Sequence, residues 1–136
     1  MKLDLSALER ALASLGKAIL RAAAEPADEE IRDAVIQRFE YSYELCWRMI
    51  KRRVEMDAPV PAEIDAMSFN ALMREAGERG LIQDVSRWLV YREQRNTTSH
   101  TYDAMKAQSV YQTARQFFPD AQALLQELLR RNDDGS

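Results

Sequence analysis

The sequence predicts an all-α protein, an antiparallel helical bundle of about five helices. Its 136 residues include only four glycines and four prolines, with 46% hydrophobic and 30% charged residues, a composition typical of a compact helical domain. Apolar residues recur every three or four positions, and no segment alternates apolar and polar residues as a strand does. We therefore predict one helical domain over residues 1–131 and a disordered tail over residues 132–136.

The first helix is expected over about residues 4–24, with Asp4 or Ser6 as its N-cap and Pro26 stopping it. The second begins in the acidic stretch after Pro26, since carboxylates suit the positive end of a helix dipole, and ends near the basic residues 51–53. This second helix carries more apolar residues than a helix with one solvent-exposed face requires. This excess predicts that it is central in the bundle or shared with a second subunit.

Helix-breaking residues and helix-capping residues predict the remaining elements. Residues 57–67 contain two prolines and are expected to form a loop. A short helix over about residues 68–78 should end near Gly80, and Asp84 should cap the helix that follows. The last helix is expected over about residues 104–131. Pro119 predicts a kink or a restart within it, because proline removes a backbone hydrogen bond.

Charge and composition exclude several classes of function. A formal net charge of −3 gives no broad basic field for nucleic acid, so any contact with RNA must be local. One cysteine and one histidine supply neither an internal disulfide nor a structural zinc site, so we expect no metal, no cofactor and a reducing cytoplasm. The N-terminal segment is charged throughout, which argues against a signal peptide or any association with a membrane.

The segment "SRWLVYREQRNTTSHTYD", residues 86–103, begins as an amphipathic helix whose apolar stripe then turns polar. On an ideal helix Arg95 lies nearly in line with Tyr102, and Asn96 lies beside His100. His100 suits proton transfer to or from a ribose hydroxyl, and the Arg95 guanidinium matches phosphate oxygens. These residues predict phosphodiester chemistry without a metal. The alternative is a capping and hydrogen-bonding cluster at a helix end.

Two acidic residues on the second helix are weaker candidates. Glu40 and Glu44 lie four residues apart and would orient Arg95 or His100 if their helix packs beside the motif. A solvated face, or a salt bridge from Glu44 to Arg48, is the preferred interpretation. Neither carboxylate is therefore assigned a catalytic role.

Other side chains near the motif also allow two interpretations. Three aromatic residues of the second helix suit either base stacking or packing in the core or a dimer contact, and packing is preferred: Tyr41, Tyr43 and Trp47. Arg92 suits either a phosphate contact or a surface pair with Asp84 or Glu93. Cys46 is expected to be a small core residue.

The stretch "RNTTSHTY" resembles the Arg-x4-His-x-Tyr signature of HEPN proteins, the higher eukaryote and prokaryote nucleotide-binding family. The segments "RFEYSYELCWRMIKR" and "REAGERGLIQDVSRWLVYREQRNTTSHTYD" resemble the branch known as nucleotidyltransferase substrate-binding proteins, which includes HEPN toxins. The similarity extends over about residues 5–129. It implies a helical bundle of HEPN type that forms homodimers, with two copies of the Arg and the His in a cleft between subunits.

The resemblance also implies a function and roles for individual residues. Several such proteins are metal-independent endoribonuclease toxins, paired in a two-gene toxin–antitoxin system with a minimal nucleotidyltransferase. By this resemblance Arg95 and His100 are catalytic, Asn96 is a supporting polar residue, and Tyr102 is the site where the partner attaches AMP to silence the toxin. Adenylate groups there would bring negative charge and bulk beside the motif. Without the resemblance, Tyr102 would be interpreted as a rim tyrosine with a wet hydroxyl.

Two alternatives to a nuclease remain open at this point. One is a noncatalytic subunit that binds a nucleotide, RNA or another substrate in the same cleft and presents it to the nucleotidyltransferase. The other is a structural partner that retains the motif only for dimer contacts. The intact motif favours activity over the purely structural role, but it does not separate cleavage from binding.

Overall fold

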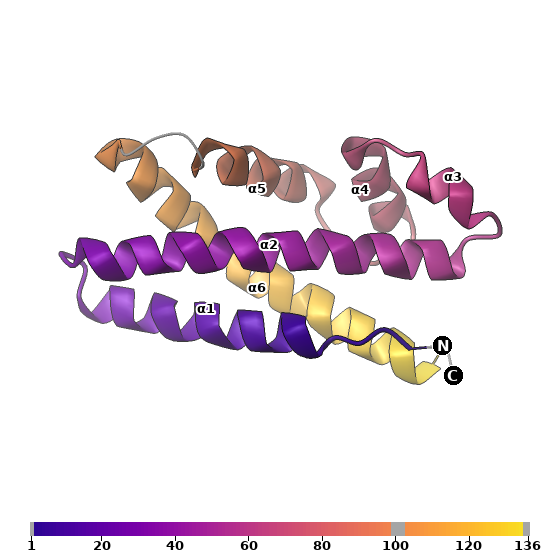
Figure 1. Ribbon diagram of the computed structural model, residues 1–136, viewed down its shortest axis with the longest axis horizontal. Helices are drawn as coiled ribbons and strands as arrows, with labels where there is room; N and C mark the ends of the chain where they lie inside the picture. The colour runs from indigo at the N-terminus through magenta and orange to yellow at the C-terminus, as the bar shows by residue number, and fades with distance from the viewer. Residues whose placement is uncertain (1, 99–102, 135–136) are drawn as a thin grey trace.

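The computed structural model describes residues 2–98 and 103–134, and these form six helices with no strand. Figure 1 shows α1 (Ser6–Ala24) and α2 (Glu29–Asp57) side by side and antiparallel, with α6 (Ala104–Asp134) crossing them at an angle. The shorter helices α3 (Pro61–Asp65), α4 (Phe69–Glu78) and α5 (Val85–Thr98) lie along the opposite side of α2. The predicted all-α class is confirmed, and α2 is the central helix.

A side chain caps the start of α2 but not that of α1. Asp28 accepts from the backbone N–H groups of Glu30 and Ile31, at 2.9 and 3.2 Å, and so caps α2. The N-cap of α1 is Leu5, which makes no side-chain capping hydrogen bond, so the prediction of Asp4 or Ser6 as the N-cap is wrong. Asp4 instead accepts from both the backbone N–H and the hydroxyl of Ser6, the first residue of α1. The Ser6 hydroxyl holds the pKa of the Asp4 carboxyl below its usual range.

The segment between α2 and α4 differs from its prediction. Residues 57–67, expected to form a loop, include the short helix α3 (Pro61–Asp65), and Ile64 on it is buried against the core. Pro61 is pre-organised for the first position of a helix, which explains why a proline starts this one. The Ser68 hydroxyl then caps α4, and Gly80 adopts a positive φ of 74° just beyond its end, as predicted.

The predicted cap of α5 is confirmed, and of the kink or restart predicted at Pro119 the restart is wrong. Asp84 caps α5 by accepting from the backbone N–H of Arg87 at 3.2 Å. Helix α6 continues through Pro119 as one element, so the predicted restart is wrong. Proline has no N–H to donate to the carbonyl of Arg115, four residues earlier. Pro119 and Arg115 are both exposed, so this carbonyl lies on the solvent-exposed side of the helix.

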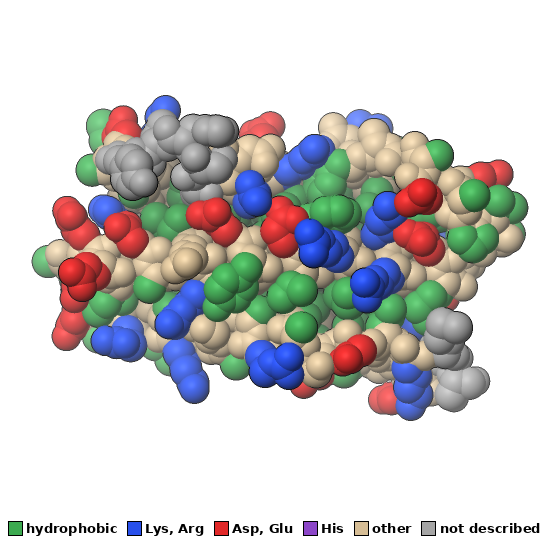
Figure 2. All heavy atoms as spheres, in the orientation of Figure 1, with side chains coloured by type: hydrophobic (Ala, Val, Ile, Leu, Met, Phe, Trp, Pro, Cys, Tyr) green, Lys and Arg blue, Asp and Glu red, His purple; other side chains and the backbone are tan. Residues whose placement is uncertain are grey.

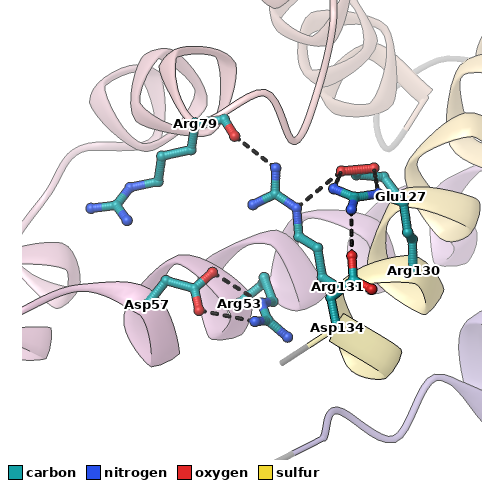
Figure 3. Close-up of polar contacts among 7 residues, drawn as sticks. All are labelled: Arg53, Asp57, Arg79, Glu127, Arg130, Arg131 and Asp134. Carbon is teal, nitrogen blue, oxygen red and sulfur yellow. Dashed lines mark hydrogen bonds and ion pairs between the residues drawn. The ribbon is translucent and has the colours of Figure 1, made fainter. Parts of the chain in front are cut away.

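The last turn of α6 is ordered by contacts to the start of the chain. Residues 132–134, expected in a disordered tail, are helical, and Asn132 exchanges hydrogen bonds of 3.0 and 2.9 Å with the backbone of Leu3. Figure 3 shows the neighbouring arginines, where Arg130 and Arg131 share Glu127 and Arg131 donates to the Arg79 carbonyl at 2.6 Å. These contacts correct the predicted start of the tail; residues 135–136 lie outside the described residues.

An aromatic cluster joins α2, α5 and α6. Phe117 of α6 is fully buried, and its ring centroid lies 5.1 Å from that of Phe39, 5.3 Å from Tyr91 and 5.8 Å from Trp88. These contacts are edge-on, the favourable arrangement for aromatic rings. The cluster holds the first half of α5 firmly against α2, which determines where the polar second half of α5 lies.

The face of the molecule drawn in Figure 2 carries both signs of charge and an apolar patch. Figure 2 shows hydrophobic side chains exposed along the line where α1 and α2 meet. The shallow groove there is lined by Ala7, Arg10, Ala11, Tyr41, Glu44, Leu45 and Arg48. The Tyr41 side chain in this groove is 40% exposed. In the described part of the chain, none of the helices has both the length and the apolar character that crossing a bilayer requires.

Candidate functional site

The polar end of α5 faces a pocket. Trp88 and Tyr91, earlier on the helix, are buried in the aromatic core, whereas Arg92, Arg95 and Asn96 line a cavity beside α2. The stripe turns polar here because its later positions face this cavity. The other two residues predicted for the site, His100 and Tyr102, lie outside the described residues.

Arg95 is held by a carboxylate of α2. Its Nε lies 2.9 Å from Glu44 Oε1, and the two side chains are 29% and 30% exposed. The other carboxylate oxygen of Glu44 accepts from the Trp47 indole N–H at 2.9 Å, whereas Arg48 approaches only to 4.0 Å. The predicted salt bridge from Glu44 to Arg48 is therefore present only as a long contact, and the prediction did not give Glu44 its shorter pair with Arg95. Glu44 pairs with Arg95 because α2 packs beside the motif.

The cavity lies where α2, α3, α4 and α5 meet, and its volume is about 430 Å³. It is lined by Tyr43, Glu44, Trp47, Lys51, Ile64, Met67, Phe69, Leu72, Arg92, Arg95 and Asn96. This volume is within the range of roughly 300–1,000 Å³ that small-molecule sites occupy. Three cations and one carboxylate line it, so the cavity is locally positive although the chain has a net charge of −3. Such a site attracts phosphate.

Arg92 takes a position that the sequence did not predict. Its guanidinium lies over the Phe69 ring, 4.3 Å from the centroid, rather than beside Asp84 or Glu93. Phe69 in turn meets the edge of Trp47, with centroids 6.2 Å apart. Phe69 itself was not recognised as a site residue, because nothing in the sequence places the start of α4 against α5.

The aromatic residues of α2 divide into three environments. Tyr43 is buried, as the packing interpretation predicted, and burial raises the pKa of its hydroxyl. That hydroxyl has no hydrogen-bond partner among the described residues. Tyr41 is exposed near α1 and bonds the Ser14 hydroxyl at 3.2 Å, while Trp47 lines the cavity. Cys46 is fully buried and burial raises its thiol pKa, which confirms it as a core residue.

The described part of the site has the groups needed to bind a phosphate and a flat ring. Arg95 presents a guanidinium held by Glu44, and Arg92 presents another over an aromatic face. Across residues 2–98 and 103–134, His, Cys, Asp and Glu side chains do not gather in threes as they do around a bound metal ion. The pocket therefore suits an anion with an attached ring.

The sequence matches one protein family over nearly all its length. Residues 3–130 match the family described as "Nucleotidyltransferase substrate binding protein like". A curated relative from Haemophilus influenzae, named "Probable ribonuclease HepT", is 37% identical over 96% of this chain and 95% of its own length. The match includes all six helices apart from the end of α6.

Solved structures agree with this assignment. HI0074 of Haemophilus influenzae, described as having the fold of a substrate binding domain of a nucleotidyltransferase, superposes with a TM-score of 0.87 at 35% identity, over 92% of this chain and 98% of its own. A protein of Thermus thermophilus superposes with a TM-score of 0.76 at 27% identity, over 89% and 98% of the two chains. The chain therefore belongs to the nucleotidyltransferase substrate binding protein-like family.

Proposed function

We propose that this protein is a HEPN ribonuclease of the toxin type, cutting RNA without a metal through Arg95 and His100. The observation that carries the proposal is the pair of Arg95 with Glu44 at the rim of a locally positive pocket. A guanidinium whose orientation is fixed before substrate binds is what stabilisation of a phosphoryl transition state requires. The relative named as a probable ribonuclease supports the same reaction class.

The proposed step is transesterification within the RNA strand. His100 removes the proton of a ribose 2′-hydroxyl, the 2′-oxygen forms a bond to phosphorus, and the bond from phosphorus to the 5′-oxygen of the next nucleotide breaks. The 5′-oxygen takes a proton as it leaves, giving a 2′,3′-cyclic phosphate and a 5′-hydroxyl. Arg95 stabilises the charge that grows on the phosphoryl oxygens, and Asn96 supports it as a hydrogen-bonding neighbour.

We propose that the active form is a homodimer. The groove between α1 and α2 exposes the apolar Tyr41 and includes Glu44, the residue that holds Arg95. A second copy seated on this groove would cover exposed apolar surface and bring two sites close together. Two copies of the site would supply one His100 as base and a second as acid.

The proposed partner is a minimal nucleotidyltransferase, consistent with the family to which the chain belongs. In this proposal the partner attaches AMP to the hydroxyl of Tyr102 and releases pyrophosphate from ATP. The added phosphate is negatively charged and close in sequence to Arg95 and His100. It would compete for the cationic groups that RNA needs, and so silence the toxin.

A second candidate function is a noncatalytic substrate-binding subunit. The observation that favours it is the pocket of about 430 Å³, whose lining combines cationic groups with the aromatic rings of Trp47 and Phe69, as a nucleotide site requires. The structural relative HI0074 is described as a substrate binding domain of a nucleotidyltransferase. In this alternative the same pocket holds a nucleotide for the partner and nothing is cut.

Expression in a bacterial host without the partner separates the two. Wild-type protein and His100→Ala are produced at matched soluble levels, and growth is followed together with the integrity of transfer and messenger RNA. Growth arrest with RNA cleavage that disappears in His100→Ala supports the nuclease. Unchanged growth and intact RNA, with soluble wild-type protein, would move the assignment to the binding subunit.

A further inference from the structure

The cavity beside Arg95 extends beyond the groups that the proposed reaction uses. Arg95 and Asn96 stand at one side of it, while Trp47 and Phe69 supply aromatic rings from α2 and α4. The volume of about 430 Å³ is more than one phosphate group needs. From this excess and from its lining we infer that the cavity is a subsite for one nucleotide unit of single-stranded RNA, next to the phosphate held by Arg95; this inference rests on the proposed function.

The aromatic part of the cavity suits an unstacked base. Phe69 and Trp47 meet edge to face, and the Arg92 guanidinium lies 4.3 Å above the Phe69 ring. Single-stranded RNA is bound in this manner, by bases stacked on aromatic rings or on the flat face of an arginine. Arg92 is exposed and lines the cavity, so a base could stack on its guanidinium while the Phe69 ring supports the opposite face.

The charges around the cavity suit the phosphates on either side of that base. Lys51 of α2 lines the cavity and pairs with Asp65 of α3 at 2.7 Å. Arg92 and Arg95 line it from α5. Only Glu44 among the lining residues is acidic. This positive charge belongs to a chain that is acidic overall, so it is a local feature of the kind that a short RNA segment would require.

A buried polar side chain also forms part of the cavity wall. Tyr43 lines the cavity, and its hydroxyl has no hydrogen-bond partner among the described residues. Buried hydroxyl groups are normally hydrogen-bonded, and one left without a partner is destabilising. A base edge would reach this hydroxyl only when the side chains that cover it move aside, and would then provide donors and acceptors for it.

The test uses the two tryptophans as a reporter and an internal control. Trp47 lines the cavity, whereas Trp88 is buried in the aromatic core. A tetranucleotide of 2′-O-methyl RNA, which has no free 2′-hydroxyl and is not cut, is titrated into the full-length protein, and both indole N–H signals are followed by NMR. We expect a saturable shift of the Trp47 signal and none of the Trp88 signal.

Two arginine variants provide the matched comparison. Arg92→Ala removes a cavity guanidinium, and Arg74→Ala removes an exposed arginine of α4 outside the cavity, with the same change in net charge. We expect Arg92→Ala to weaken binding roughly five- to tenfold and to reduce the slope of log Kd against log salt by about 0.7. Arg74→Ala should leave both unchanged. Phe69→Leu, which keeps an apolar side chain, should weaken binding by at least about fivefold.

Titration with AMP and UMP distinguishes a strand of RNA from a free nucleotide. If AMP and UMP bind much more weakly than the tetranucleotide, the nucleotide in the cavity belongs to an RNA strand. If they bind equally well, the ligand is a free nucleotide and the RNA assignment is overturned. An unresponsive Trp47, or equal effects of Arg92→Ala and Arg74→Ala, overturns the subsite altogether.

The subsite and the nuclease can fail separately. RNA cleavage that depends on Arg95, with no response of Trp47 to the tetranucleotide, removes the subsite and leaves the nuclease. Binding that Arg92→Ala weakens, with no cleavage of unmodified RNA by the wild-type protein, removes the nuclease and retains the subsite.

Discussion

The ion pair between Glu44 and Arg95 gives the most direct prediction. Glu44→Gln keeps the length of the side chain and an acceptor for the Trp47 indole N–H, but it removes the charge that faces Arg95 Nε across 2.9 Å. Because the two side chains are 29% and 30% exposed, solvent screens part of the attraction. We expect the free energy of unfolding to fall by about 1 kcal/mol and the Tm by about 3–5 °C.

A double-mutant cycle isolates this interaction from other effects of each change. The variants are Glu44→Gln, Arg95→Met and the double variant, unfolded in urea at two salt concentrations. We expect a coupling free energy of about 1 kcal/mol that decreases as salt increases.

Arg48 supplies the matched control for this cycle. Its Nη2 lies 4.0 Å from the same carboxylate, and its side chain is 61% exposed. The coupling of Glu44 with Arg48→Met should therefore stay below about 0.3 kcal/mol. A Glu44–Arg95 coupling no larger than the Glu44–Arg48 coupling would refute the assignment of Glu44 as the residue that positions Arg95.

Three further predictions concern the core and the end of α6. Phe117→Ala should lower the free energy of unfolding by about 3–5 kcal/mol, measured in urea, since the fully buried ring contacts aromatic residues of two other helices; a loss below about 1 kcal/mol would contradict the packing described. Tyr43→Phe removes a buried hydroxyl that has no partner among the described residues, so we expect thermal unfolding to show equal or greater stability, by up to about 1 kcal/mol. The hydrogen bond from Arg130 holds the pKa of the Glu127 carboxyl at about 2. The stability that the ionised Glu127 gives the fold is therefore complete above the ordinary carboxyl pKa of about 4.5, and it is lost as the pH falls towards 2. Glu127→Gln should remove about 1–2 kcal/mol at pH 7, less than the pKa alone would give because the carboxylate is 22% exposed, and acid titration of both proteins should show the difference vanishing near pH 2.

The helices could be predicted because their signals are local. Asp28, Ser68 and Asp84 each cap the helix that follows them, and a cap together with apolar periodicity is readable within one turn of sequence. The errors arose where the local signal was ambiguous. Two prolines at residues 59 and 61 suggested a loop, but Pro61 begins α3. Pro119 suggested a restart, but its exposed position lets α6 continue.

The site could be predicted only in part, for a related reason. The change from apolar to polar residues along one face of α5 indicated Arg95 and Asn96 as site residues, and both line a cavity. The partner of Arg95 depends on how α5 packs against α2, which is determined by tertiary contacts such as the Phe117 cluster. For the same reason, the place of Phe69 beneath Arg92 was not visible in the sequence.

Cleavage of RNA by Arg95 and His100 without a metal is the activity proposed for this protein. The most direct measurement compares purified wild-type protein, Arg95→Ala and His100→Ala on a defined RNA in the presence of EDTA, with each variant first shown to be folded. We predict cleavage by the wild type that leaves 2′,3′-cyclic phosphate ends, reduced by at least about 100-fold in each variant. Cleavage that EDTA abolishes would rule out a metal-independent reaction, and cleavage that both variants retain at the wild-type rate would rule out Arg95 and His100 as the catalytic residues.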